Sequence, residues 1–230
     1  MKEDLADLVN ALMEKVKPPC KNCDAFCCEQ QALSQLYIVV DKSAEKEMKE
    51  KNPGLISYLK FEIGKDEYVV RKPKIDASNM NIFGVDKDYT LKTSNGILEI
   101  PIMGVEVDPI GKTGKCKALT PDNKCSIHSY KPLLGRLFPF MLIPNTIRGT
   151  YNSVYFTGTF NLFVVPCKDV VRKRAEAFSK RDKEDVLQIV RGILRLEPSY
   201  LVRLTALFDL KQNLARSYES TRRNYVEIIV

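Results

Sequence analysis

The chain has 230 residues, of which 44% are hydrophobic and 28% are charged, and this composition is too apolar for a disordered protein. A chain of this length supports one core, so we expect one domain, or one domain with an appendage. Seven cysteines against one histidine and no tryptophan set the sequence apart.

The first predicted element is an amphipathic helix that ends before Pro18 and Pro19. Its apolar residues recur at helical spacing and are Leu5, Leu8, Val9, Leu12 and Val16. Charged residues interrupt this segment, so it lacks the apolar run of a secretory signal, and we expect a cytoplasmic protein. The longest uncharged stretch, 149–167, contains several Asn and Thr residues and is typical of strands, so no membrane span is expected.

Four cysteines follow the first helix in the pattern C-x-x-C-x-x-x-C-C, at Cys20, Cys23, Cys27 and Cys28. A C-x-x-C turn places two thiolates a few ångströms apart, where both can reach one metal ion or iron–sulfur cluster. Adjacent side chains diverge, so Cys27 and Cys28 are expected to have different roles. In a reducing cytosol disulfides are rare outside hyperthermophiles, which makes metal ligation the leading interpretation. Disulfide pairing and burial as small apolar side chains are the alternatives.

The middle of the chain predicts a small sheet with long loops. A buried strand is expected at 36–40, and a short helix at 43–51 that ends near Pro53 and Gly54. Further strands are expected around 66–71, 97–103, 138–143 and 153–163.

Three more cysteines lie far along the chain, at Cys116, Cys125 and Cys167. The turn-rich segment 120–123 predicts a hairpin that folds Cys116 and Cys125 back towards each other, where they could complete the metal site. His128 has a spacing from Cys125 that suits a further ligand, but a hydrogen-bonding or surface role is equally consistent. We leave it out of the predicted ligand set.

Beyond residue 167 the pattern changes to helices. Asp182 is expected to cap a helix with the buried stripe Val186, Ile189, Val190, Ile193 and Leu194. Ser199 is a candidate cap for a last helix with a broad apolar face. The sequence therefore predicts an α+β fold with a small mixed or antiparallel sheet and long loops around a cysteine metal site, an N-terminal helix and a C-terminal helical region. We divide it into a metal-binding domain at 1–167 and a basic helical region at 168–230 packed on it.

The cysteine motifs carry a resemblance. Together with C-x-x-L at 116–119, C-S-I-H-x-x-K-P at 125–132 and R-x-F-P at 136–139, the four-cysteine motif resembles the YkgJ-type cysteine-cluster family. That family is described as a zinc- or iron-chelating domain, often labelled an iron–sulfur protein, with no assigned biochemical role. The resemblance covers mainly 18–30 and 114–141, with Cys167 as a late cysteine of the pattern.

The chain departs from the family pattern in two places. The family usually has a cysteine before the arginine of R-x-F-P, where this chain has Gly135, so one implied ligand is missing or replaced. The stretch between Cys28 and Cys116 is also longer than the family implies, which suggests an insertion within 43–111. Arg136 allows two interpretations. Its guanidinium could offset the charge of a thiolate site, or the prolines and leucines around it could simply form a buried turn.

The number of cysteine thiols favours one metal site. Seven thiols cannot fill two sites of four cysteines each, and all-thiolate ligation fits both zinc and a four-iron cluster. Family labelling favours a [4Fe–4S] cluster, with zinc as the alternative. The expected ligands come from Cys20, Cys23, Cys27, Cys28, Cys116, Cys125 and Cys167, and Cys28 is the least certain of them.

The formal charge is +7, and the region 168–230, with 14 basic and 9 acidic residues, holds most of the excess. Its basic residues could contact RNA or a ribosome, although a solvated helix face is the commoner explanation. The candidates are Arg172, Lys173, Arg174, Arg222 and Arg223.

No phosphate loop, catalytic triad or radical motif is present, so the sequence names no reaction and no small-molecule substrate. We expect a metal-binding cysteine-cluster protein; the alternative is a basic RNA-associated or ribosome-associated protein whose metal is structural.

Overall fold

The computed structural model describes residues 4–18, 37–70, 87–107, 114–148, 154–165, 167–210 and 226–227. These residues form helices and antiparallel sheets, so the predicted α+β class is confirmed. Within this described part, no helix is both long and apolar enough to cross a membrane.

Helix α1, at Leu5–Val16, forms where the sequence predicts it. The Asp4 side chain accepts a hydrogen bond from the Ala6 N–H at 3.1 Å and caps the first turn, and Lys17 ends the helix in a left-handed conformation. Leu12 and Val16 are fully buried and form the inner face of the helix. The predicted amphipathic stripe is therefore the face that packs on the core.

Strand β5, at Ile97–Val107, is the centre of the largest sheet. It pairs with β1 at Tyr37–Val39 and with β2 at Ile56–Glu62, so that Val39 and Ser57 both lie opposite Ile102. Short strand β6, at Gly114–Cys116, pairs with the end of β5. The segment 43–111, which the sequence suggested to contain an insertion, thus supplies the central strand of this sheet.

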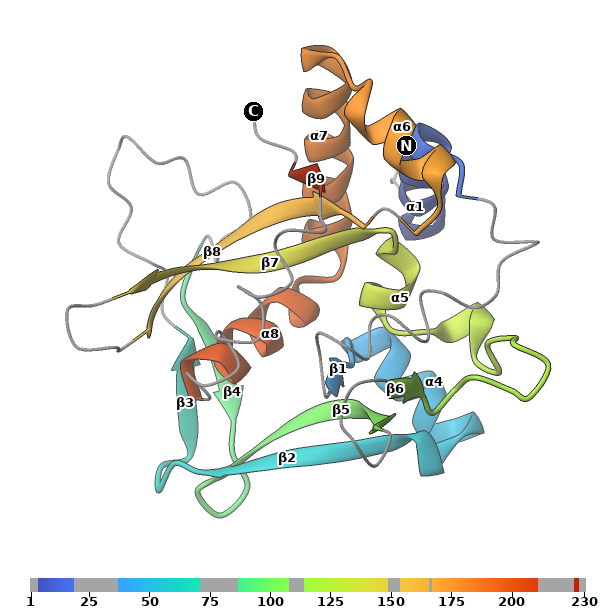
Figure 1. The fold of residues 1–230 in the computed structure, drawn as a ribbon. Helices are drawn as coiled ribbons and strands as arrows, with labels where there is room; N and C mark the ends of the chain where they lie inside the picture. Colours follow the sequence, from blue (N-terminus) through green and yellow to red (C-terminus); the bar gives the residue numbers. More distant parts are fainter. Residues whose placement is uncertain are drawn as a thin grey trace.

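The same segment forms a long ribbon that bends at two glycines. Strands β3 at Glu67–Val70 and β4 at Tyr89–Lys92 pair with each other, and the ribbon then turns into the β2–β5 ladder (Figure 1). Gly64 and Gly96 both have positive φ, and a Cβ on Gly96 would lie only 3.1 Å from the Gly64 backbone. Glycine is needed at this bend because no other residue allows both the conformation and the close approach.

A second antiparallel ribbon joins β7 at Phe140–Arg148 to β8 at Val154–Val164, and β9 at Val226–Glu227 pairs with β8. Helix α8, at Pro198–Leu210, contacts β8, β1 and β3, and therefore lies between this ribbon and the first sheet (Figure 1). Helix α7, at Lys180–Leu196, contacts α1 and α8, and α6, at Asp169–Glu176, also contacts α1. One buried cluster includes residues from both sides of the predicted boundary at 167/168, and the division itself stays a prediction.

The structure corrects several predicted elements. The N-cap of α7 is Ser179 rather than Asp182, because Ser179 and Asp182 form a capping box and the helix begins at Lys180. Ser199 lies inside α8, where its hydroxyl accepts from the Lys42 N–H at 2.8 Å instead of capping its own helix. Strands β2 and β4 and helix α6 were not predicted, because each is short or strongly charged and its apolar periodicity is weak.

The remaining elements link the sheets. Helix α4 spans Lys42–Lys51 and is followed by a 3₁₀ turn, η2, at Pro53–Leu55. A second 3₁₀ turn, η3, lies at His128–Tyr130, and the short helix α5 at Leu133–Leu137. The η3 turn and α5 follow Cys125 directly in the chain.

Candidate metal centre

Cys116 and Cys125 belong to one tight hairpin. Cys116 ends β6 opposite Val105, and Leu119, whose N–H donates to the Cys116 carbonyl at 2.9 Å, bridges to Cys125. The hairpin that the sequence predicted is therefore present.

The turn of this hairpin is held by Thr120. Its hydroxyl donates to Oδ1 of Asp122 at 2.6 Å and accepts from the Lys124 N–H at 3.0 Å. Asn123 adopts a left-handed conformation with φ of 59°, which asparagine tolerates better than most residues. The turn is thus fixed by local polar groups, independently of any metal.

All three described cysteines lie at the edge of the core or inside it. Cys116 and Cys167 are only 8% and 7% exposed, and Cys125 is half-buried. Cys167 follows β8 directly and precedes α6, and its N–H donates to the Val165 carbonyl at 2.7 Å. A metal bound here would be largely shielded from water, as structural zinc and iron–sulfur sites commonly are.

His128 lies after the hairpin at the start of η3. Its N–H donates to the Cys125 carbonyl at 3.3 Å, and its side chain is exposed. The positive charge of Lys131, together with partial burial, lowers the pKa of His128 below its usual 6.5. The imidazole is therefore neutral at pH 7, which is the state a ligand would need but which also suits a surface group.

The R-x-F-P element follows at α5. Leu133, Leu134 and Leu137 are buried, and the Phe138–Pro139 peptide bond is cis. This burial agrees with the interpretation of the element as a buried turn. Gly135 has no conformational need to be glycine, and a Cβ there would meet only the Lys131 side chain, at 3.4 Å or more. Neither the backbone conformation nor the space around Cα explains why residue 135 is glycine.

Arg136 pairs with a carboxylate that the sequence analysis missed. Its Nη2 donates to Oδ1 of Asp41 at 3.0 Å and to the Ser43 hydroxyl at 3.1 Å. The Asp41 side chain is wholly buried, at 0% exposure, at the corner between β1 and α4. The partly exposed Arg136 and the buried Asp41 cancel each other's charge, so Arg136 adds little net positive charge to a thiolate site. In the described part of the chain its buried Nε has no hydrogen-bond partner.

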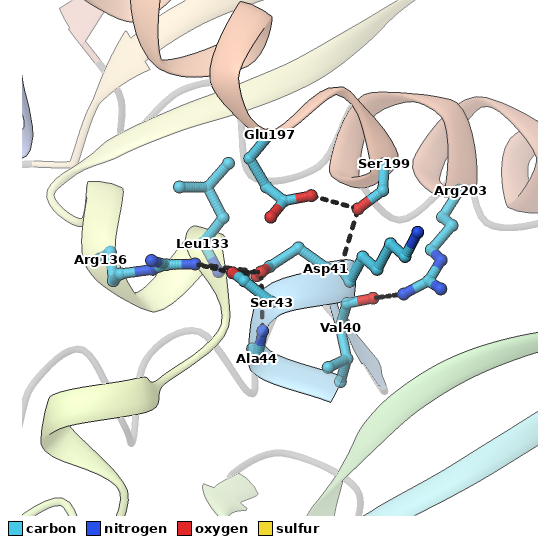
Figure 2. A network of polar contacts seen from close by, with 10 residues as sticks. Val40, Asp41, Ser43, Ala44, Leu133, Arg136, Glu197, Ser199 and Arg203 are labelled. Atoms are coloured by element: carbon cyan, nitrogen blue, oxygen red, sulfur yellow. Dashed lines mark hydrogen bonds and ion pairs between the residues drawn. The ribbon is translucent and has the colours of Figure 1, made fainter. Parts of the chain in front are cut away.

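The same corner is held from the other side by α8. Figure 2 shows Arg136 and Arg203 reaching it from opposite directions. Arg203 donates to the Val40 carbonyl at 2.7 Å and pairs with Glu45 of α4 at 2.6 Å. Burial would raise the pKa of Glu45, but hydrogen bonds from Lys49 and Arg203 lower it overall, so this ion pair persists at neutral pH. Asp41 was predictable as a helix cap from its place before the 43–51 helix, but its pairing with Arg136 was not.

The first four predicted ligands, Cys20, Cys23, Cys27 and Cys28, lie outside the described residues. Among the residues that are described, no three His, Cys, Asp or Glu side chains gather as a metal site. The predicted ligand set therefore stays a prediction.

The comparison with protein families shows which family the chain belongs to. A family model named CxxCxxCC, with the description "Putative zinc- or iron-chelating domain", matches residues 19–168. The chain belongs to this family. The CxxCxxCC region contains all seven cysteines and ends just before α6. No curated protein and no solved structure matches the chain.

Membership of the CxxCxxCC family supports a metal-binding role for this region, as zinc or iron chelation. The family name has two residues between its second and third cysteines, whereas this chain has Asp24, Ala25 and Phe26 between Cys23 and Cys27. The order of the cysteines is shared, and the spacing is one residue longer.

The predicted nucleic-acid residues lie beyond the CxxCxxCC region. Arg172, Lys173 and Arg174 are exposed on α6, and Arg172 pairs with Asp169 at 2.9 Å. Arg222 and Arg223 lie outside the described residues. Contact with RNA stays a prediction.

Proposed function

We propose that the protein holds one metal centre, a [4Fe–4S] cluster in preference to zinc, with ligands drawn from the Cys20–Cys28 motif and from Cys116, Cys125 and Cys167. The observation that carries this proposal is the low exposure of the late cysteines: Cys116 and Cys167 are buried, and Cys125 is half-buried. Family membership supports the chelation of zinc or iron, and four-cysteine ligation suits both.

The strand pairing of the first sheet supports this convergence of the cysteines on the C-terminal side of the four-cysteine motif. The chain leaves the four-cysteine motif through β1, whose first residue, Tyr37, lies opposite Gly104. The next residue of β5, Val105, lies opposite Cys116. Because neighbouring strands are about 4.8 Å apart, the Cα atoms of Tyr37 and Cys116 lie within roughly 10 Å of each other. Tyr37, the first described residue after the motif, is thus close to a predicted ligand.

The helix contacts support this convergence of the cysteines on the N-terminal side of the four-cysteine motif. The chain enters the motif from α1, which contacts both α5 and α6. Helix α5 follows the hairpin of Cys125, and α6 follows Cys167. Both ends of the motif are therefore attached to elements that neighbour the late cysteines.

The residues present fit such a centre. Seven cysteines offer more thiolates than one four-ligand site needs, and the buried Nε–H of Arg136, which has no acceptor among the described residues, could donate to a bound sulfur. A [4Fe–4S] cluster would supply one-electron transfer, and zinc would supply stability alone. The chain's own contribution is to exclude water from Cys116 and Cys167 and to fix the backbone at Cys125.

The test is metal analysis of native protein purified without oxygen. The proposal expects brown protein that contains iron and acid-labile sulfide, with both lost in Cys23→Ser and Cys125→Ser but kept in the neighbouring Ser126→Ala control. Colourless protein with stoichiometric zinc would exclude the cluster while keeping the metal centre. Protein without iron or zinc would contradict the proposal as a whole.

A second candidate is an RNA-associated or ribosome-associated protein in which the metal is structural. The observation in its favour is the exposed run Arg172, Lys173 and Arg174 on α6, immediately after the metal-binding region. Three adjacent cations on one short helix suit a phosphate backbone, and such binding weakens steeply with salt. Measured binding to total RNA at several salt concentrations tests it.

A further inference from the structure

We propose that Asp41 is a positioning residue of the metal centre: its buried carboxylate holds the segment between Cys125 and Cys167 against helix α4. This role rests on the metal centre proposed above and adds to it a residue outside the cysteine motifs. Asp41 touches none of Cys116, Cys125 and Cys167, the predicted ligands that the structure describes, so it would act through the backbone that carries them.

The Asp41 carboxylate accepts hydrogen bonds from two separate parts of the chain. Oδ1 accepts from the Ala44 N–H at 3.0 Å and the Ser43 hydroxyl at 2.6 Å, which caps α4. The same oxygen accepts from Arg136, and Oδ2 accepts from the Leu133 N–H at 2.5 Å. Only a charged carboxylate offers acceptors on both oxygens. In asparagine one of these oxygens becomes an NH2 group, which would point a hydrogen-bond donor at one of the N–H or O–H donors that Asp41 now accepts from.

Helix α4 also holds the same segment at its other end. The amide of Asn52, the C-cap of α4, donates to the hydroxyl of Tyr130 in η3. Asp41 and Asn52 therefore grip the chain on both sides of Lys131 and Pro132 (Figure 1 shows α4 beside α5). The helix serves as a brace for the residues between η3 and α5.

Hydrogen bonds lead from this brace to two cysteines. Towards Cys125, the Tyr130 N–H donates to the Ile127 carbonyl at 3.0 Å, and the His128 N–H donates to the Cys125 carbonyl at 3.3 Å. Towards Cys167, the Val165 N–H donates to the Pro139 carbonyl at 2.8 Å, and the Cys167 N–H donates to the Val165 carbonyl at 2.7 Å. A shift of α5 would therefore reach the backbone of both predicted ligands.

The corner that carries Asp41 is itself fixed. Ser199 of α8 accepts from the Lys42 N–H at 2.8 Å, and Arg203 donates to the Val40 carbonyl at 2.7 Å, so the residues on both sides of Asp41 are held (Figure 2). Helix α4 can hold the metal ligands in position only if it is itself fixed in the fold, and its contacts with α8 fix it.

The test compares metal release from Asp41→Asn, Tyr130→Phe and Glu45→Gln with that from wild-type protein. Glu45→Gln is the matched control, because it removes a carboxylate one turn along the same helix that pairs with Arg203 of α8, while the bond from Arg203 to the Val40 carbonyl, which anchors the corner, is kept. Native protein is mixed with excess chelator under conditions where every variant is folded by circular dichroism, and metal loss is followed with time. We expect release about tenfold faster for Asp41→Asn, a smaller increase for Tyr130→Phe and no change for Glu45→Gln.

The absorption spectrum separates positioning from simple stability. Sulfur-to-metal charge-transfer bands report the ligand geometry, with cobalt(II) in place of zinc if zinc is the native metal. We expect altered bands in Asp41→Asn and Tyr130→Phe and unaltered bands in Glu45→Gln. If Asp41→Asn does not fold, the milder Tyr130→Phe decides. Wild-type protein that binds metal, with both variants releasing it at the wild-type rate, overturns this role alone; wild-type protein without metal overturns the proposed function and this role with it.

Discussion

Nη2 of Arg136 lies 3.0 Å from Oδ1 of Asp41, an ion pair between residues 95 positions apart whose acidic partner is wholly buried. This pair joins the R-x-F-P element of the metal-binding region to the corner where β1 meets α4. Removing one partner of a buried pair strands the other charge away from water, which costs more than the pair itself contributes.

Arg136→Gln should lower the free energy of unfolding by about 3 kcal/mol, because it leaves the Asp41 carboxylate buried without its cation. Urea denaturation of metal-free protein measures the change. Arg172→Gln is the control, since its pair with Asp169 is exposed and should contribute less than about 1 kcal/mol. The double change Asp41→Asn with Arg136→Gln should cost less than the sum of the single changes; simple additivity would argue against a coupled pair.

Serine substitutions should divide the cysteines into ligands and others. Serine is nearly the size of cysteine but is a poor ligand for soft metals, so four of the seven Cys→Ser variants, Cys23→Ser and Cys125→Ser among them, should lose most of the bound metal, and the other three should keep it. Cys116→Ser and Cys167→Ser test the remaining late cysteines. Cys28→Ser should lose least among the motif residues. Metal is measured per folded chain, with Ser126→Ala as the control. Full metal retention in all three late variants would restrict the centre to the Cys20–Cys28 motif.

His128, the single histidine, should titrate below pH 6.5, because the positive charge of Lys131 and partial burial disfavour its protonated form. The unfolded chain then binds more protons than the folded one between the lowered pKa and 6.5, so the stability contribution of His128 declines as the pH falls through that window. Proton NMR of the one imidazole gives the pKa directly. Lys131→Gln should move the midpoint up; an unchanged midpoint would remove Lys131 as the cause.

The RNA hypothesis predicts a salt-dependent interaction that charge reversal on α6 abolishes. Arg172→Glu with Arg174→Glu should weaken RNA binding and lower the slope of log affinity against log salt by about two, one for each lost phosphate contact. Arg195→Glu, an equally exposed change on α7, is the control. Metal content should be unaffected in all variants. Wild-type protein that does not bind RNA at low salt would leave metal binding as the remaining function.

Much of the molecule follows from local sequence. Helix α1, strand β1, helix α4 and the hairpin turn at 120–123 were all predictable, because apolar periodicity and capping or turn residues act over a few positions. The cysteine pattern likewise indicated the metal-binding family without any structure.

Other features depended on long-range packing. The use of Ser199 as an acceptor for the Lys42 N–H and the pairing of strand β2 could not be predicted from neighbours in sequence, because each depends on a partner elsewhere in the fold. The start of α7, by contrast, is set by the local capping box of Ser179 and Asp182.

The sequence by itself indicated the metal-binding family and the candidate thiolates, since these rest on residue type and spacing. Only the tertiary structure placed Asp41 against Arg136 and brought α8 onto the corner that carries it. The physical reason is that a buried carboxylate is stable only where distant donors converge on it, and nothing in the residues next to Asp41 specifies which donors those are.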